Sequence, residues 1–239
     1  MKNQAKALFA VAFLVVMIPA SSFALVPYSQ DFEGLDQANT AALADDGWLV
    51  FGNVFDGDGN YLYGYGVFPA PNDGGGFCAI AAGEGGADQG AQQLAVFSDY
   101  NNTDHANGFL IEANVFQEQM IEDGDVSDNW VFTFDAKRGN IEGQTTALAF
   151  IKTLDPNNGF QMTNFVTVDM MSIPDIWGTY SVSLIIDGGL VGQILQIGFA
   201  STATLYEGSG IFYDNIDWSI DGPVATEEKT LSNVKSLFR

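Results

Sequence analysis

The chain after position 24 consists of short runs rich in β-branched and aromatic residues, separated by Gly, Asn, Asp and Pro. This pattern is typical of strands that end in turns. The clearest runs cover residues 48–55, 61–68, 94–97, 109–116, 130–135, 146–153, 165–169, 180–186, 194–199 and 211–220. Because no connecting segment has a helical period of useful length, we expect an all-β fold, an antiparallel two-sheet β-sandwich, rather than alternating strands and helices.

The first 24 residues have the features of a secretory signal peptide. Lys2 and Lys6 precede an apolar run over 8–18, and Ser22-Phe23-Ala24 is a small-x-small cleavage site. The run is shorter than the roughly 20 residues that span a bilayer, and no run of spanning length follows it. We therefore expect export, with no transmembrane segment after cleavage.

We expect one β domain over residues 25–222, followed by a linker and a short amphipathic segment over 223–239. In that segment Leu231, Val234 and Phe238 have helical spacing. An isolated helix this short is marginal in water, so the segment either docks on something or frays. A sorting or anchoring tag and a disordered tail are both compatible with it.

Charge limits the partners that are compatible with this chain. The net charge is −22, and Lys2 and Lys6 leave with the signal peptide. Between residues 25 and 222 the cationic side chains are Lys137, Arg138 and Lys152 alone, too few for a phosphate-binding face. We therefore expect no nucleic-acid partner. Acidity favours both solubility and divalent cations, and composition does not separate the two.

The single cysteine and the loop sequences provide further expectations about the fold. Cys78 has no partner for an intramolecular disulfide, so the core and a metal are left to hold the fold. Residues 155–159 and 187–189 have hairpin-turn chemistry, and each is expected to join neighbouring antiparallel strands. Residues 69–90 are rich in Gly, Ala and Asp and are expected to form a long surface excursion, either functional or inert.

Acidic-aromatic segments stand at both ends of the strand-rich region, over residues 28–34 and 211–218. If the first and last strands pair, Glu33 and Asp214 meet at the rim of the sandwich, where carboxylate oxygens suit Ca²⁺. Alternation within 213–218 predicts that Asp214 points the same way as Ile216 and Trp218. A carboxylate at the edge of a core needs a partner, and a metal can supply it.

These two ends, Asp-Phe-Glu-Gly around Glu33 and Phe-Tyr-Asp-Asn-Ile around Asp214, resemble the ends of secreted jelly-roll carbohydrate-binding modules of the galactose-binding-like type. As architecture the resemblance covers most of residues 25–222, and as motif it covers the two ends only. It implies a jelly roll with a structural calcium ion between the opening and closing strands, and a glycan as ligand.

A second possible calcium loop is Asp56-Gly-Asp58-Gly-Asn60, which has alternating oxygen ligands and flexible glycines. It is not a complete EF-hand, because position twelve of the loop falls on Val67 and no flanking helices are apparent. The alternative is an Asp/Gly turn that joins two strands.

Aromatic side chains provide the candidate glycan surface. Tyr61, Tyr63 and Tyr65 alternate with smaller residues, so we expect three rings on one face of a strand, spaced for stacking on sugars. A structural tyrosine-rich face between the sheets is the alternative. Further residues complete the predicted surface: Tyr100 and Trp177 as stacking rings, and Asn102 and His105 as polar contacts in the loop over 98–107.

The leading hypothesis is a secreted, non-catalytic carbohydrate-binding domain that has a structural calcium site and binds extracellular glycan. One alternative is a structural protein of the cell surface or matrix, attached through residues 227–239. Another is a polysaccharide-active enzyme on the same fold, with His105 or Lys152 as first candidates for acid-base chemistry. Common hydrolase and nucleotide-binding motifs are absent from the sequence.

Overall fold

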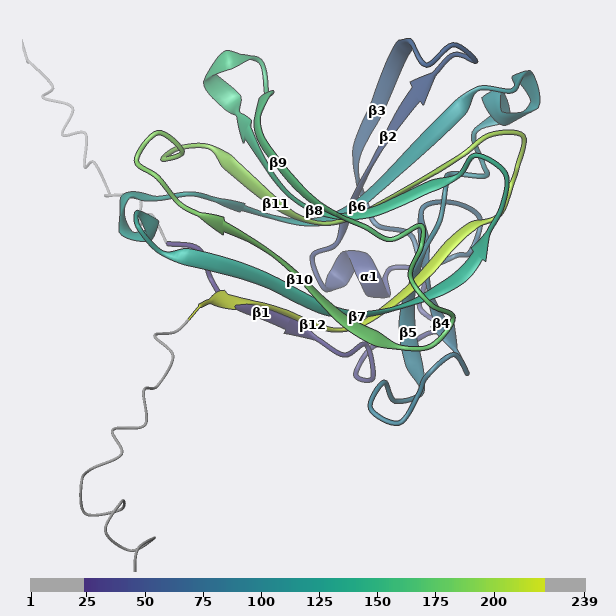
Figure 1. Ribbon diagram of the computed structural model, residues 1–239, viewed down its shortest axis with the longest axis horizontal. Helices are drawn as coiled ribbons and strands as arrows, with labels where there is room; N and C mark the ends of the chain where they lie inside the picture. The colour runs from purple at the N-terminus through teal and green to yellow at the C-terminus, as the bar shows by residue number, and fades with distance from the viewer. Residues whose placement is uncertain (1–23, 222–239) are drawn as a thin grey trace, which may run out of the picture.

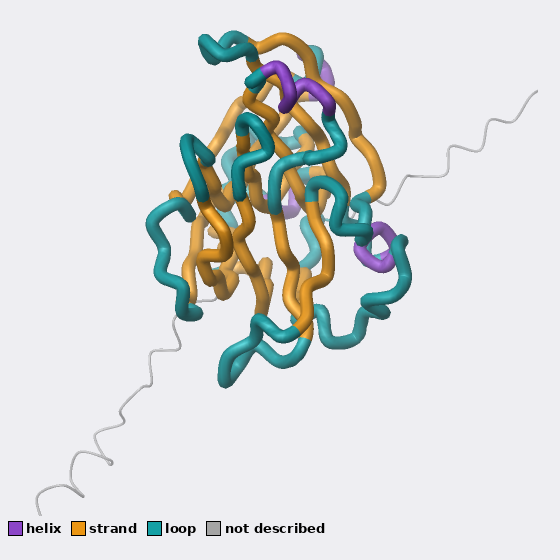
Figure 2. The backbone as a smooth tube through the Cα atoms, turned by 90° about the vertical axis from the view of Figure 1, so that its right-hand side faces the viewer, coloured by secondary structure: helices purple, strands orange, loops and turns teal. Residues whose placement is uncertain are grey.

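The structure is a computed structural model that describes residues 24–221. The predicted signal peptide, apart from Ala24, and the predicted C-terminal segment lie outside the described residues. Two antiparallel sheets pack face to face (Figure 1), and the loops gather at the ends of the strands (Figure 2). The predicted β-sandwich of the jelly-roll type is confirmed.

Sheet A has the strand order β10-β7-β12-β5-β4, and β1 pairs with β12. Sheet B has the order β3-β2-β6-β11-β8-β9. The strands of sheet A are β1 (Tyr28–Gln30), β4 (Cys78–Ala82), β5 (Gln92–Val96), β7 (Asn129–Ile141), β10 (Gly178–Ile185) and β12 (Ser209–Ile220). Those of sheet B are β2 (Leu49–Phe55), β3 (Tyr61–Pro69), β6 (Leu110–Met120), β8 (Thr146–Asp155), β9 (Gln161–Asp169) and β11 (Ile194–Ala203). The short helices are α1 (Ala42–Asp45), η1 (Thr103–Asn107), η2 (Asp123–Asp125) and η3 (Pro156–Asn158).

The predicted pairing of the chain ends is confirmed. The opening strand β1 runs antiparallel to the closing strand β12, with Tyr28 opposite Trp218 and Gln30 opposite Ile216. From β6 to β8, and again from β10 to β12, the chain crosses from one sheet to the other at each connection. Strands that are far apart in sequence are therefore neighbours in space, as in other jelly rolls.

The main core lies between the sheets and is rich in aromatic rings. Phe199 of sheet B stacks on Tyr213 of sheet A, with ring centroids 3.6 Å apart, and Trp130 stacks on Trp218 at 4.9 Å. The predicted alternation in β12 is wrong, because Tyr213, Ile216 and Trp218 all lie in this core. A register shift between Asp214 and Asp217, with Asn215 at a φ of +46°, inserts an extra residue and reverses the alternation.

Two loop predictions need correction and one is confirmed. Residues 155–159 do join the neighbouring strands β8 and β9. The turn at 187–189 lies between β10 of sheet A and β11 of sheet B, so it connects the sheets rather than paired strands. The excursion over 69–90 includes β4, which pairs with β5 through the apolar run that begins at Phe77. Within the described part of the chain, no helix has the length and hydropathy to cross a membrane.

Sheet B also carries apolar side chains on its outer face. A second cluster, separate from the main core, contains Phe116, Phe150 and Ala200, and Leu49, Phe51 and Leu148 pack against it. These residues alternate along their strands with core residues such as Val115 and Ile151. Figure 1 shows the β2–β3 and β8–β9 hairpins rising on either side of the middle of this sheet. The outer face of sheet B is therefore concave.

Candidate functional site

A cavity of about 240 Å³ lies on this concave face, and we call it the groove. Its residues come from four neighbouring strands of sheet B, from the edge strand β3 and from the β8–β9 hairpin. The lining residues are Phe51, Asn53, Val67, Phe116, Lys152, Leu154, Phe160 and Gln196. A concave site with mostly apolar walls and a few fixed polar groups is the usual form of a ligand-binding site.

A hydrogen-bonded network crosses the floor of the groove. The side-chain amides of Asn53 and Asn114 both donate to Oε1 of Glu112, at 2.7 and 2.8 Å. Lys152 donates from Nζ to Oδ1 of Asn114 at 3.2 Å. Beside this network, the amide of Gln196 on β11 donates to the carboxylate of Glu118 on β6 at 2.8 Å. Each group is held by a neighbour from another strand, so the network is fixed before any ligand arrives.

Lys152 is the unusual member of this network. Its Nζ lies 4.5 Å from the ring centroid of Phe150 and 5.5 Å from that of Phe165, in cation–π geometry. Burial lowers the pKa of Lys152, and the nearby Glu112 carboxylate opposes that shift. An ammonium group has three donors, and among the described residues one is used, on Asn114. The remaining donors are available to a ligand.

Exposed apolar side chains form the two rims of the groove. Phe160 stands at the tip of the β8–β9 hairpin, 59 % exposed and at a φ of +61°. A bulky residue is rarely found in this left-handed region, and such strain clusters at functional sites. On the opposite rim Val67 is exposed, and Tyr61 packs against Phe55 with centroids 5.8 Å apart. The groove thus has apolar walls above a polar floor.

The predicted platform of three tyrosines is wrong. A register shift in the β2–β3 pair places Tyr61 opposite Phe55, whereas Tyr63 is opposite Val54. Tyr61 therefore lies over Gly64 on the outer face, and Tyr65 lies over Gly52 on the inner face. The inner pair is held by hydrogen bonds from Tyr63 to Asp104, at 2.7 Å, and from Tyr65 to Asp99, at 2.8 Å.

Asn102 and His105, the predicted polar contacts for a ligand, make contacts within the protein. Asn102 caps η1, because its Oδ1 accepts from the backbone N of Asp104 at 2.9 Å. The buried His105 ring lies between Tyr100 and Tyr206, at 5.5 and 4.9 Å, with Nε2 3.2 Å from the hydroxyl of Ser98. Burial lowers the pKa of His105, so the ring is held neutral.

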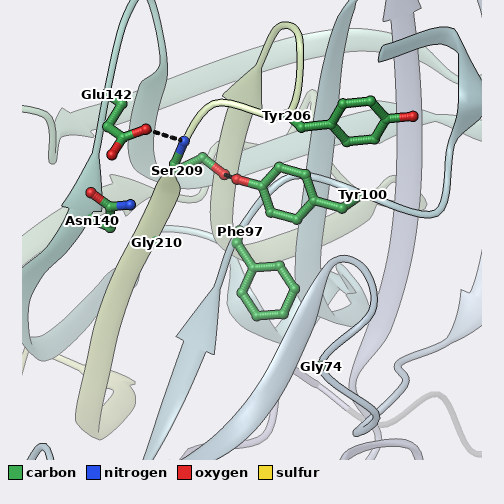
Figure 3. A pocket seen from close by; sticks show the side chains of 9 residues that line it. Gly74, Phe97, Tyr100, Asn140, Glu142, Tyr206, Ser209 and Gly210 are labelled. Carbon is green, nitrogen blue, oxygen red and sulfur yellow. Dashed lines mark hydrogen bonds between the residues drawn. The ribbon is translucent and has the colours of Figure 1, made fainter. Parts of the chain in front are cut away.

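Tyr100 and Trp177 line two other surface cavities. Tyr100 faces a pocket at the loop end of the sandwich (Figure 3). Trp177 lines a polar pocket beside Lys137, whose Nζ lies 5.5 Å from the Trp177 ring centroid. The predicted ligand-binding residues therefore lie at separate places, and Tyr61 alone is near the rim of the groove.

The Asp56–Asn60 segment forms the hairpin turn between β2 and β3. Oδ1 of Asp56 accepts from the backbone N of Asp58 at 2.9 Å and of Asn60 at 2.8 Å, and Oδ2 accepts from the Asn60 amide at 3.0 Å. These contacts lower the pKa of the exposed Asp56 carboxyl, chiefly through the Asn60 side chain. Its oxygens are occupied within the turn, in agreement with the alternative interpretation of this motif.

Glu33 follows β1, and Asp214 lies on β12 of sheet A, close enough for the Glu33 carboxylate to influence the Asp214 carboxyl group. Oε1 of Glu33 accepts from the backbone N of Ala91 at 2.7 Å and of Gln92 at 2.6 Å. Asp214 is fully buried; its Oδ1 accepts from the backbone N of Asn215 at 2.7 Å, and its Oδ2 has no hydrogen-bond partner among the described residues. Burial raises the pKa of Asp214 to about 7, opposed by the Asn215 N–H and reinforced by Glu33, Asp135 and Asp31.

This arrangement fits a bound cation. A buried carboxylate oxygen without a partner, close to other carboxylates, leaves negative charge uncompensated. Oε2 of Glu33 makes no hydrogen bond to the described residues, so it is free to act as a ligand. Within residues 24–221 no group of three or more Asp, Glu, His or Cys side chains has metal-binding geometry, so backbone or amide oxygens would have to complete the shell.

Sequence reasoning missed the groove as a site, although it singled out Lys152. The strand over 146–155 carries apolar residues on both faces, Ala149 and Ile151 inward and Leu148 and Phe150 outward. A strand at the surface of a sandwich ordinarily has one polar face, so this double pattern was the available signal.

No protein-family model matches the chain, and no curated protein matches it. Solved structures similar to it include the xylan-binding domain of carbohydrate-binding module family 22, at a TM-score of 0.44 and 13 % identity, over 82 % of this chain and 96 % of that one. A cyclase from Fischerella sp. TAU has a TM-score of 0.43 and 13 % identity, over 82 % and 98 %. A bacteriophage CBA120 tailspike domain has a TM-score of 0.44 and 12 % identity; it matches 78 % of this chain, which spans 21 % of that one. No function follows from similarities at this level.

Proposed function

We propose that this protein is a non-catalytic carbohydrate-binding domain and that its glycan lies in the groove of sheet B. The observation that carries the proposal is the half-buried network of Asn53, Glu112, Asn114 and Lys152 between apolar walls. Glycans present apolar C–H faces together with hydroxyls that donate and accept hydrogen bonds. The aromatic rings of the rim suit the apolar C–H faces. The amides, the carboxylate and the ammonium group of the floor suit the hydroxyls.

The energetic cost of the network supports a ligand-binding role. A lysine on the outer face of a sheet can ordinarily extend into water, but the Lys152 ammonium is desolvated, which lowers its pKa. Burying a charged group costs free energy unless it is paired and hydrogen-bonded. The stability of a sandwich does not require this cost, because its core lies on the other face of the sheet. A ligand that accepts hydrogen bonds from the unused donors of Lys152 would explain why the lysine is held in this position.

We further propose that Ca²⁺ binds between the opening and closing segments, with Glu33 and Asp214 as side-chain ligands. The unpartnered Oδ2 of Asp214 supports this site. A bound cation would compensate the carboxylates and link the segment after β1 to β12. Its role there would be structural, since Asp214 lies in sheet A and the groove is on sheet B. The predicted signal peptide supports export, and hence an extracellular glycan or a cell-surface component as partner.

The test is binding of the full chain to a panel of soluble polysaccharides, by calorimetry and affinity electrophoresis. Lys152→Met keeps the length of the side chain and removes the charge, and Phe160→Ala removes the rim ring. A hydrogen bond to a charged group contributes about 1.5–3 kcal/mol, so Lys152→Met should weaken binding about tenfold or more. Phe160→Ala should weaken it to a similar degree, because the apolar face of a sugar ring loses the aromatic surface on which it packs.

Ile185→Ala is the matched control, because Ile185 is 65 % exposed on β10 of the other sheet. It should leave affinity unchanged. Thermal melts would check that each variant is folded. If the wild type binds no polysaccharide of the panel, or if both groove variants bind as the wild type does, the groove is not a glycan site.

A polysaccharide-active enzyme is the second candidate function, and one observation favours it. Lys152 has a lowered pKa and lies near the Glu112 carboxylate, and catalytic bases need such a shift. The same polysaccharides, incubated with the protein and analysed for chain length, distinguish the two functions. A binding domain leaves the chain length unchanged, whereas shortening that disappears in Lys152→Met would establish catalysis.

A further inference from the structure

A larger cavity of about 570 Å³ lies at one end of the sandwich, and we call it the loop-end pocket. It is formed by the segment after β5, the connection from β7 to β8, and the β11–β12 loop with the start of β12, and Gly74 from the segment between β3 and β4 also lines it. Figure 3 shows aromatic side chains on one side of it and Asn140 and Glu142 on the other. Its volume is within the range of small-molecule sites, about 300–1,000 Å³.

The aromatic wall is a continuous stack of rings. Phe97 and Tyr100 are stacked at 6.0 Å and 13°, Tyr100 and His105 at 5.5 Å, and His105 and Tyr206 at 4.9 Å. Two contacts fix the Tyr100 hydroxyl, which donates to the backbone O of Glu207 at 2.5 Å and lies 2.6 Å from the hydroxyl of Ser209. The wall is therefore preorganised, which reduces the entropy that a ligand must lose on binding.

Tyr206 is presented to solvent by an unusual backbone. It is 50 % exposed, and both Leu205 and Tyr206 have left-handed φ values, +46° and +61°. Hydrogen bonds between Thr204 and Glu207 close this turn, with backbone and side-chain distances of 2.8 Å. Two consecutive residues other than glycine in this region are costly, and such conformations concentrate at ligand-binding sites.

The polar side of the pocket is negative. Glu142 is exposed and accepts weakly from the backbone N of Gly208 at 3.3 Å, so its carboxylate is available to a ligand. Asn140 adds an exposed amide with both donor and acceptor groups. No lysine, arginine or histidine is among the residues that line the cavity. The pocket therefore disfavours anionic ligands.

We propose that the loop-end pocket is a second sugar-binding site, which takes neutral or amino-bearing sugar rings and rejects uronic acids. A ring face packs on Tyr206 and Phe97, and the hydroxyl or ammonium groups bond to Asn140 and Glu142. This site shares no lining residue with the groove, so it stands independently of the function proposed for the groove. A protein with both sites holds a polysaccharide at two points and gains avidity when one chain spans them.

The experiment uses saturation-transfer NMR on the full chain with three probes, methyl glucoside, glucosamine and glucuronate. It is made in the wild type and in Lys152→Met, which disables the groove. The first two probes should bind in both proteins, and glucuronate should bind about tenfold more weakly or not at all. Tyr206→Ala in the Lys152→Met background should reduce binding of the first two about tenfold or more, while Leu205→Ala should leave it unchanged. Leu205 is the matched control because it is 60 % exposed in the same turn and does not line the pocket.

Glu142→Gln provides a second test that does not alter the aromatic wall. It should reduce the preference for glucosamine over glucuronate about tenfold, because it removes the carboxylate and keeps the shape. The proposal is overturned if Lys152→Met abolishes binding of all probes, or if Tyr206→Ala and Leu205→Ala behave alike. If Tyr206→Ala abolishes binding and Lys152→Met has no effect on polysaccharide affinity, this pocket stands and the groove proposal fails.

Discussion

The buried Asp214 provides the sharpest prediction, namely that its effect on stability has opposite pH dependence with and without calcium. Its raised pKa means that, without a metal, the folded protein holds a proton that the unfolded chain has already lost between pH 3.8 and about 7. Stability then falls as pH rises through this window, and the full cost remains above it. Asp214→Asn removes the charge at nearly constant shape, so it should remove this part of the pH dependence.

The size of the effect follows from the two pKa values. A change from 3.8 to about 7 corresponds to about 4 kcal/mol at 1.36 kcal/mol per pKa unit. This is an upper limit, because relaxation of the protein and water penetration screen even a buried charge. In metal-free buffer above neutral pH, Asp214→Asn should therefore be more stable than the wild type, with the advantage vanishing in acid. For a domain of this size each kcal/mol corresponds to about 2–4 °C in the melting temperature.

Calcium should offset much of this difference in stability. Binding requires an ionised carboxylate, so calcium stabilises the wild type increasingly as pH rises. At a hundredfold excess over its dissociation constant the gain is about 2.7 kcal/mol. Asp214→Asn should show no such gain, whereas Asp217→Asn, which changes an exposed carboxylate of the same strand, should behave as the wild type does. The assay is a series of thermal melts from acid to alkaline pH, with calcium and with chelator.

Two results would refute this reasoning. Equal metal-free pH dependence in the wild type and in Asp214→Asn would mean that Asp214 is not desolvated in the folded state. If calcium still raised the melting temperature of Asp214→Asn, the ion would bind elsewhere, and the proposed Glu33–Asp214 site would be refuted.

Two further predictions concern packing and titration outside the proposed metal site. His105 is held neutral by burial, so its contribution to stability is complete above its ordinary pKa of 6.5 and is lost as pH falls below it; His105→Phe should flatten this acid dependence in urea unfolding. Gly198 on β11 has no room for a side chain, because a Cβ there would lie 2.2 Å from the backbone O of Val115, so Gly198→Ala should cost about 1–3 kcal/mol. Gly188→Ala is its control, since a Cβ at Gly188 meets nothing within 4 Å; equal stability of the two variants in urea unfolding would contradict the packing argument.

The strand positions and the pairing of the chain ends could be predicted because they depend on local pattern. Period-two runs between turn residues mark strands wherever one face is buried, and the pairing of β1 with β12 followed from similar segments at both ends. The orientation of single side chains could not be predicted with the same rule. One extra residue near Phe55 and another near Asn215 reverse the faces of the residues that follow, and such bulges have no clear sequence signature.

The groove depends on contacts between strands that are far apart in sequence. Asn53, Glu112 and Lys152 belong to β2, β6 and β8, and only the sheet order brings them to one face. The curvature that makes this face concave depends on the whole sheet. Sequence alone identified Lys152 as one of few cations, but its neighbours could not be assigned.

The half-buried Lys152 and the buried Asp214 are desolvated ionisable groups on different sheets. The direction in which their replacement changes the stability of the protein distinguishes a ligand-binding role from a structural one. In each, burial moves the pKa toward the neutral form, down for the lysine and up for the aspartate. Neither belongs to the aromatic core between the sheets. Replacing a buried charged group by an uncharged one of similar volume is often neutral or stabilising, whereas a charge that holds the fold together is costly to remove. Because both groups are proposed to bind ligands, Lys152→Met and metal-free Asp214→Asn should keep or gain stability while losing glycan and calcium, respectively. A loss of stability without loss of binding would instead make each residue part of the scaffold.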